Sequence, residues 1–261
     1  MKLALIAGRG DLPALVAAAV ELPPLVCGYE GIELSGVSAD ITFRLETLGT
    51  LLLELGARGV TQVCFAGGLD RPAFDPAKLG AETAPLVPMF MRALQQGDDG
   101  ALRVVVDLFE KTGFEVLGAH EVAPDLLAKG GVYGFHWPDK KLRDDANVGA
   151  AKIRDMSPKD QGQACVVLHG KVLAMEQSSG TDAMISELRK AEGGILFKGP
   201  KQGQSRKVDL PTIGPATFEA AAQAGLRAVI IDAGDVLVLH AAECTAIADA
   251  HRLVFWARTG E

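Results

Sequence analysis

The stretch KLALIAGRGDLPALVAAAVE, residues 2–21, decides the fold class of this chain. Lys2 to Ala7 is short and apolar, Gly8-Arg9-Gly10 interrupts it, and Leu12 to Glu21 has the composition of a helix. A short apolar run, a glycine turn and a helical segment in that order predict a strand followed by a helix. Nucleotide-binding α/β domains often begin this way, so an α/β fold is the first expectation.

The glycine turn has two interpretations. Glycine has no Cβ, so backbone N–H groups at the start of a helix can approach a phosphate closely, which would make Gly8, Gly10 and Asp11 ligand contacts. However, the third glycine of a GxGxxG fingerprint is missing, and no acidic residue obviously follows the second predicted strand. A plain turn and a ligand loop are therefore about equally favoured.

The pattern of strands and helices continues along the first half. The predicted strands are Leu25–Tyr29, Gln62–Ala66 and Glu115–Leu117; the predicted helices are Thr47–Leu55, Leu86–Gln95 and Gly100–Lys111. Such alternation favours a parallel sheet with covering helices. Pro124 and Gly130-Gly131 then interrupt the pattern, which restarts afterwards. We therefore expect one domain over residues 1–129 and a second over residues 130–261.

The second half predicts a further α/β domain with a mixed sheet. Gln163–Leu168 and Lys171–Met175 are predicted strands joined by a hairpin turn at His169-Gly170, which makes them an antiparallel pair. The other predicted strands are Ile195–Lys198, Ala228–Ile231 and Val236–Leu239; the predicted helices are Asp144–Met156, Asp182–Lys190, Pro215–Ala224 and Ala241–Ala250.

Composition and charge exclude several classes of function. The formal net charge is −7, and no run of Lys and Arg with interleaved aromatic residues is present, so a nucleic-acid partner is not expected. The four cysteines are widely spaced in apolar surroundings, which predicts reduced core residues of a cytoplasmic protein. No apolar run approaches the ~20 residues that span a bilayer. A soluble α/β enzyme is the expectation.

Two further loops in the first half are candidate ligand-binding segments, one directly after a predicted strand and one directly before a predicted helix. Gly67-Gly68-Leu69 comes directly after a strand, where open α/β sheets place their ligands, although Asp70 and Arg71 beside it would also suit a solvated loop. Asp98 and Asp99 precede a predicted helix. For Asp99 an N-cap role is favoured over a catalytic one, because acidic residues are common at that position.

The densest polar stretch runs from Asp160 to Pro215. It contains acidic, amide and basic groups at predicted strand ends, and four of its cations lie within ten residues: Lys198, Lys201, Arg206 and Lys207. Cleavage of a phosphoanhydride needs such a mixture, since cations and N–H donors neutralise phosphate oxygens while a carboxylate positions water or Mg²⁺. An exposed basic loop is the alternative. The neighbouring glycines and Thr212–Pro215, which suggests a tight turn into a helix N-terminus, favour an anion site.

Six motifs together resemble the UDP-2,3-diacylglucosamine pyrophosphatase family, found in some bacteria that lack the calcineurin-like enzyme for this step of lipid A assembly. The motifs are IAGRGDLP (6–13), FAGGLDRP (65–72), GDDGALR (97–103), DQGQACVV (160–167), GTDAM (180–184) and KQGQSRKVDLPTIGP (201–215). The likeness spans nearly the whole chain, and the last motif is the most specific.

This resemblance implies a Rossmann-like N-terminal domain with a parallel sheet, a distinct C-terminal catalytic α/β domain, and a requirement for Mg²⁺. It implies hydrolysis of UDP-2,3-diacylglucosamine to UMP and 2,3-diacylglucosamine 1-phosphate (lipid X) in lipid A biosynthesis. Because that substrate carries two acyl chains, the resemblance also implies peripheral contact with the inner membrane. Whether the chain forms a homodimer is left open.

By the same analogy, Asp209 in DLPTIGP is the expected essential carboxylate, which positions metal or water, and Asp182 and Glu176 are second choices. The resemblance places six further residues around the phosphates and the sugar: Gln163, Thr181, Lys198, Gln204, Lys207 and Thr212. From the other domain, Gly8, Gly10 and Gly67 to Leu69 would face them, and Asp11, Asp98 and Asp99 are counted among the expected substrate contacts.

The chain departs from the family pattern at Ser179, before GTDAM, and at Ser205, within the last motif, where acidic residues are usual. Two missing negative charges beside the phosphate site keep a second hypothesis open: a protein that binds a nucleotide sugar or an acyl sugar phosphate with little or no turnover. An oxidoreductase that uses the N-terminal glycine loop for a dinucleotide is disfavoured by the incomplete fingerprint.

Overall fold

A computed structural model describes residues 2–69, 74–94, 98–157, 162–177, 179–188 and 191–260, with backbone alone at 93, 94, 98 and 99. The chain divides into two compact units. Unit 1 comprises Met1–Pro124 and Ser205–Asp209, and unit 2 comprises Asp125–Gln204 and Leu210–Glu261. The expected boundary near Lys129 falls shortly after Pro124. The return of a five-residue segment to unit 1 was not anticipated.

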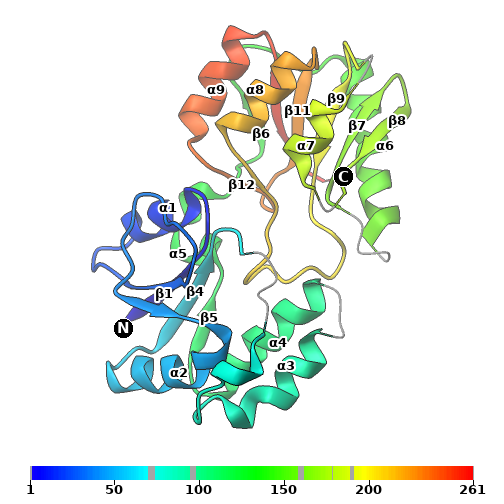
Figure 1. Ribbon diagram of the computed structural model, residues 1–261. Helices are drawn as coiled ribbons and strands as arrows, with labels where there is room; N and C mark the ends of the chain where they lie inside the picture. The colour runs from blue at the N-terminus through cyan, green and yellow to red at the C-terminus, as the bar shows by residue number, and fades with distance from the viewer. Residues whose placement is uncertain are drawn as a thin grey trace. The chain divides into compact units, whose positions relative to one another are not determined.

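The sheet of unit 1 has five parallel strands in the order β3-β2-β1-β4-β5 (Figure 1). The strands are β1 (Leu3–Ala7), β2 (Leu25–Tyr29), β3 (Ile41–Phe43), β4 (Gln62–Ala66) and β5 (Glu115–Leu117). From β1 the strand order runs outward in both directions, so β1 and β4 flank the point where the winding reverses. Ligands of open α/β sheets bind outside the carboxyl ends of strands at such a point. The expected parallel sheet is confirmed.

The helices of unit 1 cover both faces of this sheet. They are α1 (Leu12–Ala18), α2 (Leu48–Ala57), α3 (Val87–Leu94), α4 (Asp98–Lys111) and α5 (Ala119–Val122), with short 3₁₀ turns η1 (Leu45–Thr47), η2 (Pro76–Lys78) and η3 (Ala84–Leu86). Alternate residues of β1, such as Ala4 and Ile6, belong to one buried core with Leu51 and Leu55 of α2 and Phe109 of α4. Helices α1 and α5 contact β4 separately from this core.

The connection between β2 and β3 differs from the expected alternation, because residues 30–40 form an irregular loop and no helix. Strand β3, which has three residues and lies at the edge of the sheet, was not predicted. Helix α1 also ends at Ala18, earlier than the predicted Glu21.

Unit 2 has a six-stranded mixed sheet in the order β6-β13-β11-β9-β7-β8, as expected for the second domain. Its strands are β6 (Gly131–Tyr133), β7 (Ala164–Leu168), β8 (Lys171–Met175), β9 (Ile195–Lys198), β11 (Ala228–Asp232) and β13 (Val254–Arg258), and a separate parallel pair joins β10 (Thr212–Ile213) to β12 (Leu237–Val238). Strands β9, β11 and β13 are parallel, whereas β7 runs antiparallel to β9 and β8. Strands β6, β10 and β13 were not predicted.

In the described part of unit 2, four helices lie on the two faces of this sheet (Figure 1). They are α6 (Lys140–Met156), α7 (Thr181–Ser186), α8 (Pro215–Gln223) and α9 (Ala241–Ala250). A 3₁₀ turn, η4 (Pro124–Leu126), precedes them in the sequence. Phe197 of β9 and Ile230 of β11 pack with α6, while Leu196 and Val229 pack on the opposite side with α7, α8 and α9. This alternation follows from the two-residue period of side chains along a strand.

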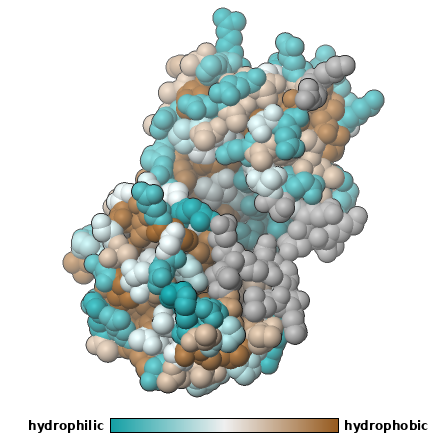
Figure 2. Space-filling view, in the orientation of Figure 1, coloured by the Kyte–Doolittle hydropathy of each residue, from teal (hydrophilic) through white to brown (hydrophobic). Residues whose placement is uncertain are grey.

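The polarity of the surface and the burial of the cysteines are as the amino-acid composition suggested. Figure 2 shows hydrophilic and hydrophobic residues mixed over the visible surface of each unit. Within the described residues, no helix combines the length and apolar character needed to span a bilayer. All four cysteines are buried and unpaired, and burial raises the pKa of each thiol to about 12, so they are neutral core side chains.

Candidate functional site

In unit 1, the two glycine loops at the reversal point pack directly against each other. Arg9 N–H donates to the carbonyl oxygen of Gly68 at 2.8 Å, and Gly68 N–H donates to that of Arg9 at 2.9 Å. A Cβ at Gly8 would lie 2.5 Å from the Gly68 oxygen, and a Cβ at Gly67 would lie 2.6 Å from the Arg9 oxygen. Close backbone approach therefore explains Gly8 and Gly67 without a ligand.

The other expected contacts of this loop pair lie apart from that backbone bridge. Gly10 has φ +87 with open space around its Cα, and Leu69 is exposed. Asp11 is exposed and accepts a hydrogen bond from the hydroxyl of Ser35 at 3.1 Å. Substrate contact by these residues stays a prediction. Asp70 and Arg71 lie outside the described residues.

Substitution of Gly67 by alanine should destabilise unit 1. A residue with a Cβ at φ +91 costs about 1–2 kcal/mol, and the contact with the Arg9 oxygen adds to it. We expect the thermal midpoint to fall by roughly 4–8 °C, measured by circular dichroism. Gly68→Ala is the matched control, because a Cβ there would meet nothing within 4 Å. Equal midpoints for the two variants would contradict this account.

The expectation that Asp99 is an N-cap is wrong. Helix α4 begins at Asp98, so Asp99 lies inside its first turn. The glycine at position 100, which suggested a later start, is itself helical. Roles of Asp98 and Asp99 in substrate contact remain predictions.

In unit 2, four of the predicted residues meet at the carboxyl end of β9. Lys198 is the last residue of β9, Gln163 immediately precedes β7 and Glu176 immediately follows β8. Because β7 is antiparallel to both neighbours, pairing of Ala164 with Lys198 brings all three to one edge of the sheet. Thr181 joins them from the first position of α7.

Direct hydrogen bonds connect this cluster. Lys198 Nζ donates to Thr181 Oγ1 at 2.9 Å, and the Thr181 hydroxyl donates to Glu176 Oε1. Glu176 Oε2 accepts from the backbone N–H of Gln163 at 2.6 Å, and Lys198 Nζ lies 4.0 Å from Glu176 Oε1. We name Gln163, Glu176, Thr181 and Lys198 the β9 cluster.

Burial makes the β9 cluster electrostatically sensitive. Glu176, Thr181 and Lys198 are each only 7% exposed. Removing an ion from water costs several kcal/mol, so a buried carboxylate and a buried ammonium persist only when they compensate each other and are hydrogen-bonded. An ammonium held in such a place strongly attracts phosphate oxygens.

The chain around the β9 cluster supplies additional amides. Gln204 Nε2 donates to the side-chain oxygen of Gln163 at 3.0 Å, and its own Oε1 accepts from the backbone N–H of Lys201 at 2.9 Å. Gly199 N–H donates to the Gln163 carbonyl at 3.1 Å. Five of the predicted residues are thus connected. Asp160 and Gln161, at the start of the polar stretch, lie outside the described residues.

Asp182 and Thr212 make other contacts. Asp182 Oδ1 accepts from the Thr217 hydroxyl of α8 at 3.4 Å. Thr212 belongs to strand β10, and its hydroxyl donates to the carbonyl of Leu210 at 3.2 Å. The expected tight turn over Thr212–Pro215 is therefore wrong, since two of its residues pair with β12, although helix α8 does begin at Pro215.

Asp209 and Lys207 lie in the middle part of their motif, Ser205–Asp209, which belongs to unit 1, whereas the residues before and after it belong to unit 2. Val208 packs against the core of unit 1, and Lys207 Nζ forms an ion pair with Glu110 of α4 at 2.5 Å. Asp209 is half-buried, and its N–H donates to the carbonyl of Ser205 at 3.0 Å. Glu110 is a residue that sequence reasoning missed, because nothing local links position 110 to position 207.

Asp232 and Arg258 were also missed. They end β11, which pairs with β9, and β13, which pairs with β11 on its other side, and Arg258 Nε lies 3.0 Å from Asp232 Oδ1. Burial raises the pKa of the Asp232 carboxyl, and the charge of Arg258 opposes that shift. The predicted strand over β11 stopped at Ile231, one residue before Asp232, and β13 was not predicted. Neither Asp232 nor Arg258 was therefore recognised as a polar residue at the end of a strand.

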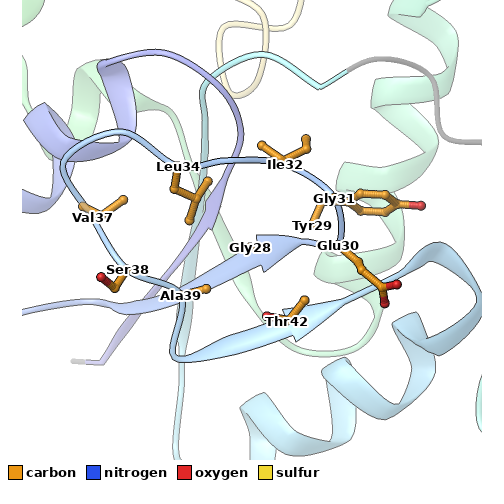
Figure 3. Close-up of a pocket in the computed structure, with 10 residues that line it drawn as sticks. All are labelled: Gly28, Tyr29, Glu30, Gly31, Ile32, Leu34, Val37, Ser38, Ala39 and Thr42. Carbon is orange, nitrogen blue, oxygen red and sulfur yellow. The ribbon is translucent and has the colours of Figure 1, made fainter.

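One pocket of unit 1, of about 420 Å³, lies under the 30–40 loop (Figure 3). Gly28 and Thr42, paired across β2 and β3, form one side, and Leu34 of the loop points toward them. None of the predicted site residues lines it. Glu30, at its rim, directly follows β2, so the statement that no acidic residue follows the second strand is wrong. Its carboxylate pairs with Arg44 at 3.3 Å.

Fold and site together define a class: an α/β protein with a Rossmann-like parallel sheet in one unit and, in the other, a buried cation–carboxylate cluster at the carboxyl end of a parallel strand. Comparison with protein families is more specific. The LpxI N-terminal domain matches residues 2–126, and the LpxI C-terminal domain matches residues 129–256. The chain belongs to the LpxI family.

A curated relative is similar to this chain over nearly its whole length. The UDP-2,3-diacylglucosamine pyrophosphatase LpxI of Caulobacter vibrioides is 36% identical over 272 aligned residues, which cover 95% of this chain and 94% of the relative. The resemblance inferred from the six motifs is confirmed at the level of the family. Ser205–Asp209 lies inside the match to the C-terminal domain yet packs with unit 1.

Proposed function

We propose that this chain hydrolyses the pyrophosphate bond of UDP-2,3-diacylglucosamine to UMP and 2,3-diacylglucosamine 1-phosphate, lipid X, in lipid A biosynthesis. The observation that carries this proposal is membership of the LpxI family over both halves of the chain, with a relative named for that activity. The β9 cluster supports it, because a buried ammonium with surrounding amides suits phosphate oxygens.

Hydrolysis consumes one water molecule. A bond forms between the water oxygen and one phosphorus, and the bond from that phosphorus to the bridging oxygen breaks. The bridging oxygen leaves with the other phosphate, and the proton that the water loses passes to the solvent. Lys198 would bind the pyrophosphate oxygens and offset the negative charge that grows on the leaving phosphate. Gln163 and Gln204, which are already hydrogen-bonded to each other, would orient the phosphates or the sugar.

Asp209 is proposed as the essential carboxylate, with Mg²⁺ as cofactor. Among the described residues no group of three or more His, Cys, Asp or Glu side chains could hold a metal ion by itself. A single carboxylate such as that of Asp209 still fits Mg²⁺, since this ion is usually held by one or two carboxylates together with substrate phosphates. Bound in that way, Mg²⁺ would neutralise pyrophosphate oxygens.

Peripheral contact with the inner membrane and a cytoplasmic location are part of the same proposal. A substrate with two acyl chains partitions into the bilayer, because each buried CH₂ group contributes about 0.8 kcal/mol. The enzyme would therefore meet it at the membrane surface.

UMP release from UDP-2,3-diacylglucosamine should require Mg²⁺. We expect turnover with millimolar Mg²⁺ and a loss of at least about 100-fold after chelation, because uncompensated phosphate charge opposes attack by water. Chromatography of UMP measures both, and restoring Mg²⁺ controls for irreversible damage. Equal rates with and without Mg²⁺ would contradict the cofactor assignment but not the hydrolysis.

The competing hypothesis is a binding protein with little turnover. Ser179 and Ser205, where the family usually has acidic residues, motivate it. Ser205 supplies the carbonyl that accepts from Asp209 N–H, so its main-chain role does not depend on an acidic side chain. Tight binding of the substrate without UMP release at any Mg²⁺ concentration would favour this alternative over hydrolysis.

A further inference from the structure

The β9 cluster contains a chain of hydrogen bonds with a defined direction. An ammonium can only donate, and a carboxylate can only accept. The Thr181 hydroxyl between them accepts from Lys198 and gives its single hydrogen to Glu176 Oε1. Glu176 is fixed at its other oxygen by the backbone N–H of Gln163. A fixed carboxylate is thus linked to the ammonium through one hydroxyl.

The backbone around this hydroxyl fixes it independently of the two charges. Gly180 adopts φ +88, a conformation that favours glycine, and Thr181 then begins α7. On the Glu176 side, Gly162 has φ +37, and a Cβ there would lie 2.8 Å from Glu176 Cβ. Close approach of Glu176 requires a glycine at position 162, whereas at position 180 the positive φ alone favours glycine, since a Cβ there would meet nothing within 4 Å.

We infer that Thr181 and Glu176 are positioning residues that set the place of the Lys198 ammonium. This inference rests on the proposed function, in which Lys198 binds pyrophosphate oxygens. It changes the expected role of Glu176, whose two oxygens are engaged by Thr181 and Gln163, from a catalytic carboxylate to a support for the cation.

Loss of the hydroxyl would move the cation. Lys198 Nζ and Glu176 Oε1 are 4.0 Å apart, and Thr181 occupies the bridge between them. Without the bridge, attraction across a low-dielectric interior draws the ammonium toward Glu176. A displacement near 1 Å can lower a catalytic rate by about 100-fold.

Comparison of Thr181→Val with Thr181→Ser separates the effect of the hydroxyl on catalysis from the effect of the side-chain shape. In the full chain, Thr181→Val should lower kcat for UMP release about 10- to 100-fold, with a smaller change in KM, because a misplaced cation matters most where charge develops. Thr181→Ser should recover most of that loss. Thr245→Val, a threonine-to-valine change on α9 outside the cluster, should leave both constants unchanged.

Calorimetry with UDP provides a readout that does not need turnover. Thr181→Val should bind UDP about fivefold or more weakly than Thr181→Ser, since the cation that faces the diphosphate is displaced. A wild-type chain that releases no UMP would contradict the proposed function, and the UDP measurement would then decide the role of Thr181. Equal values for the Val and Ser variants in both measurements overturn the inference.

A second variant covers the case in which Thr181→Val does not fold. Glu176→Gln keeps the side-chain size and an oxygen that can accept from Thr181, but it removes the charge that holds the ammonium. We expect kcat to fall about 10-fold while the thermal transition stays cooperative. An unchanged kcat in Glu176→Gln also overturns the inference.

Discussion

Asp209→Ala is expected to abolish UMP release, with a loss of at least about 1,000-fold in kcat, while the chain still unfolds cooperatively. Asp209 is the proposed carboxylate that positions Mg²⁺ or water, and such groups contribute several kcal/mol to the stability of the transition state. The resemblance of DLPTIGP to the family motif motivates the choice, and the structure supplies the reason why folding should tolerate it.

That reason is the way in which the Asp209 segment is anchored. Val208 packs in the core of unit 1, the Lys207–Glu110 ion pair closes at 2.5 Å, and the backbone of Asp209 bonds to Ser205. These contacts come from neighbouring residues and from the main chain. These three contacts therefore remain when the carboxylate is replaced.

Two further variants test this prediction. Asp125→Ala is the matched control, because Asp125 has a side chain that is 96% exposed and pairs only loosely with Lys129 at 3.6 Å. It should retain the wild-type rate. Asp209→Asn tests whether the charge or the shape matters, and it should be as inactive as the alanine variant. Retained turnover in either Asp209 variant would remove this residue from the mechanism.

Lys198→Met should have the second-largest effect, with two separable consequences. UMP release should fall about 100- to 1,000-fold, because the cation proposed to bind the pyrophosphate is gone. Stability should also fall, by about 3–5 kcal/mol, because Glu176 is left as a buried charge without compensation. Methionine approximates the length of the lysine stem, so lost packing contributes little.

The double variant Lys198→Met with Glu176→Gln separates the two consequences. Removal of both charges should recover much of the lost stability, since no ion then remains buried without a partner. It should recover none of the activity. Lys140→Met, at a lysine whose side chain is 92% exposed, is the matched control and should change neither quantity. An active double variant would show that the Lys198 charge is not needed for turnover.

Much of the fold was predictable because its signals are local. Buried strands such as Leu25–Tyr29, Gln62–Ala66 and Ile195–Lys198 were predicted with the bounds that the structure has. The His169-Gly170 turn was confirmed by positive φ at both residues, which matches a two-residue hairpin. Among the described strands, β3, β6 and β10, of two or three residues each, were missed, and so was the five-residue strand β13.

Within the candidate site, residues were predicted correctly where the signal lies in the adjacent sequence, and were missed where it depends on residues far along the chain. Polar residues at the ends of predicted strands are site candidates. This criterion found Lys198, which ends an apolar run, and Glu176, which directly follows one. It could not find Asp232 or Arg258, because the strands that carry them were truncated or not predicted. Interpretation of Gly8 and Gly67 as ligand contacts also overlooked a simpler cause, the packing of one loop on the other.

By itself, the sequence determined the α/β class, the parallel and mixed sheets, and the family, because periodicity, turns and motifs are written along the chain. Only the tertiary structure decided which polar residues act together. Antiparallel pairing of β7 with β9 brought Gln163, Glu176 and Lys198 to one edge, and the anchoring of Val208 assigned Asp209 to unit 1. Contacts between residues far apart in sequence depend on strand order and core packing, which no local pattern records.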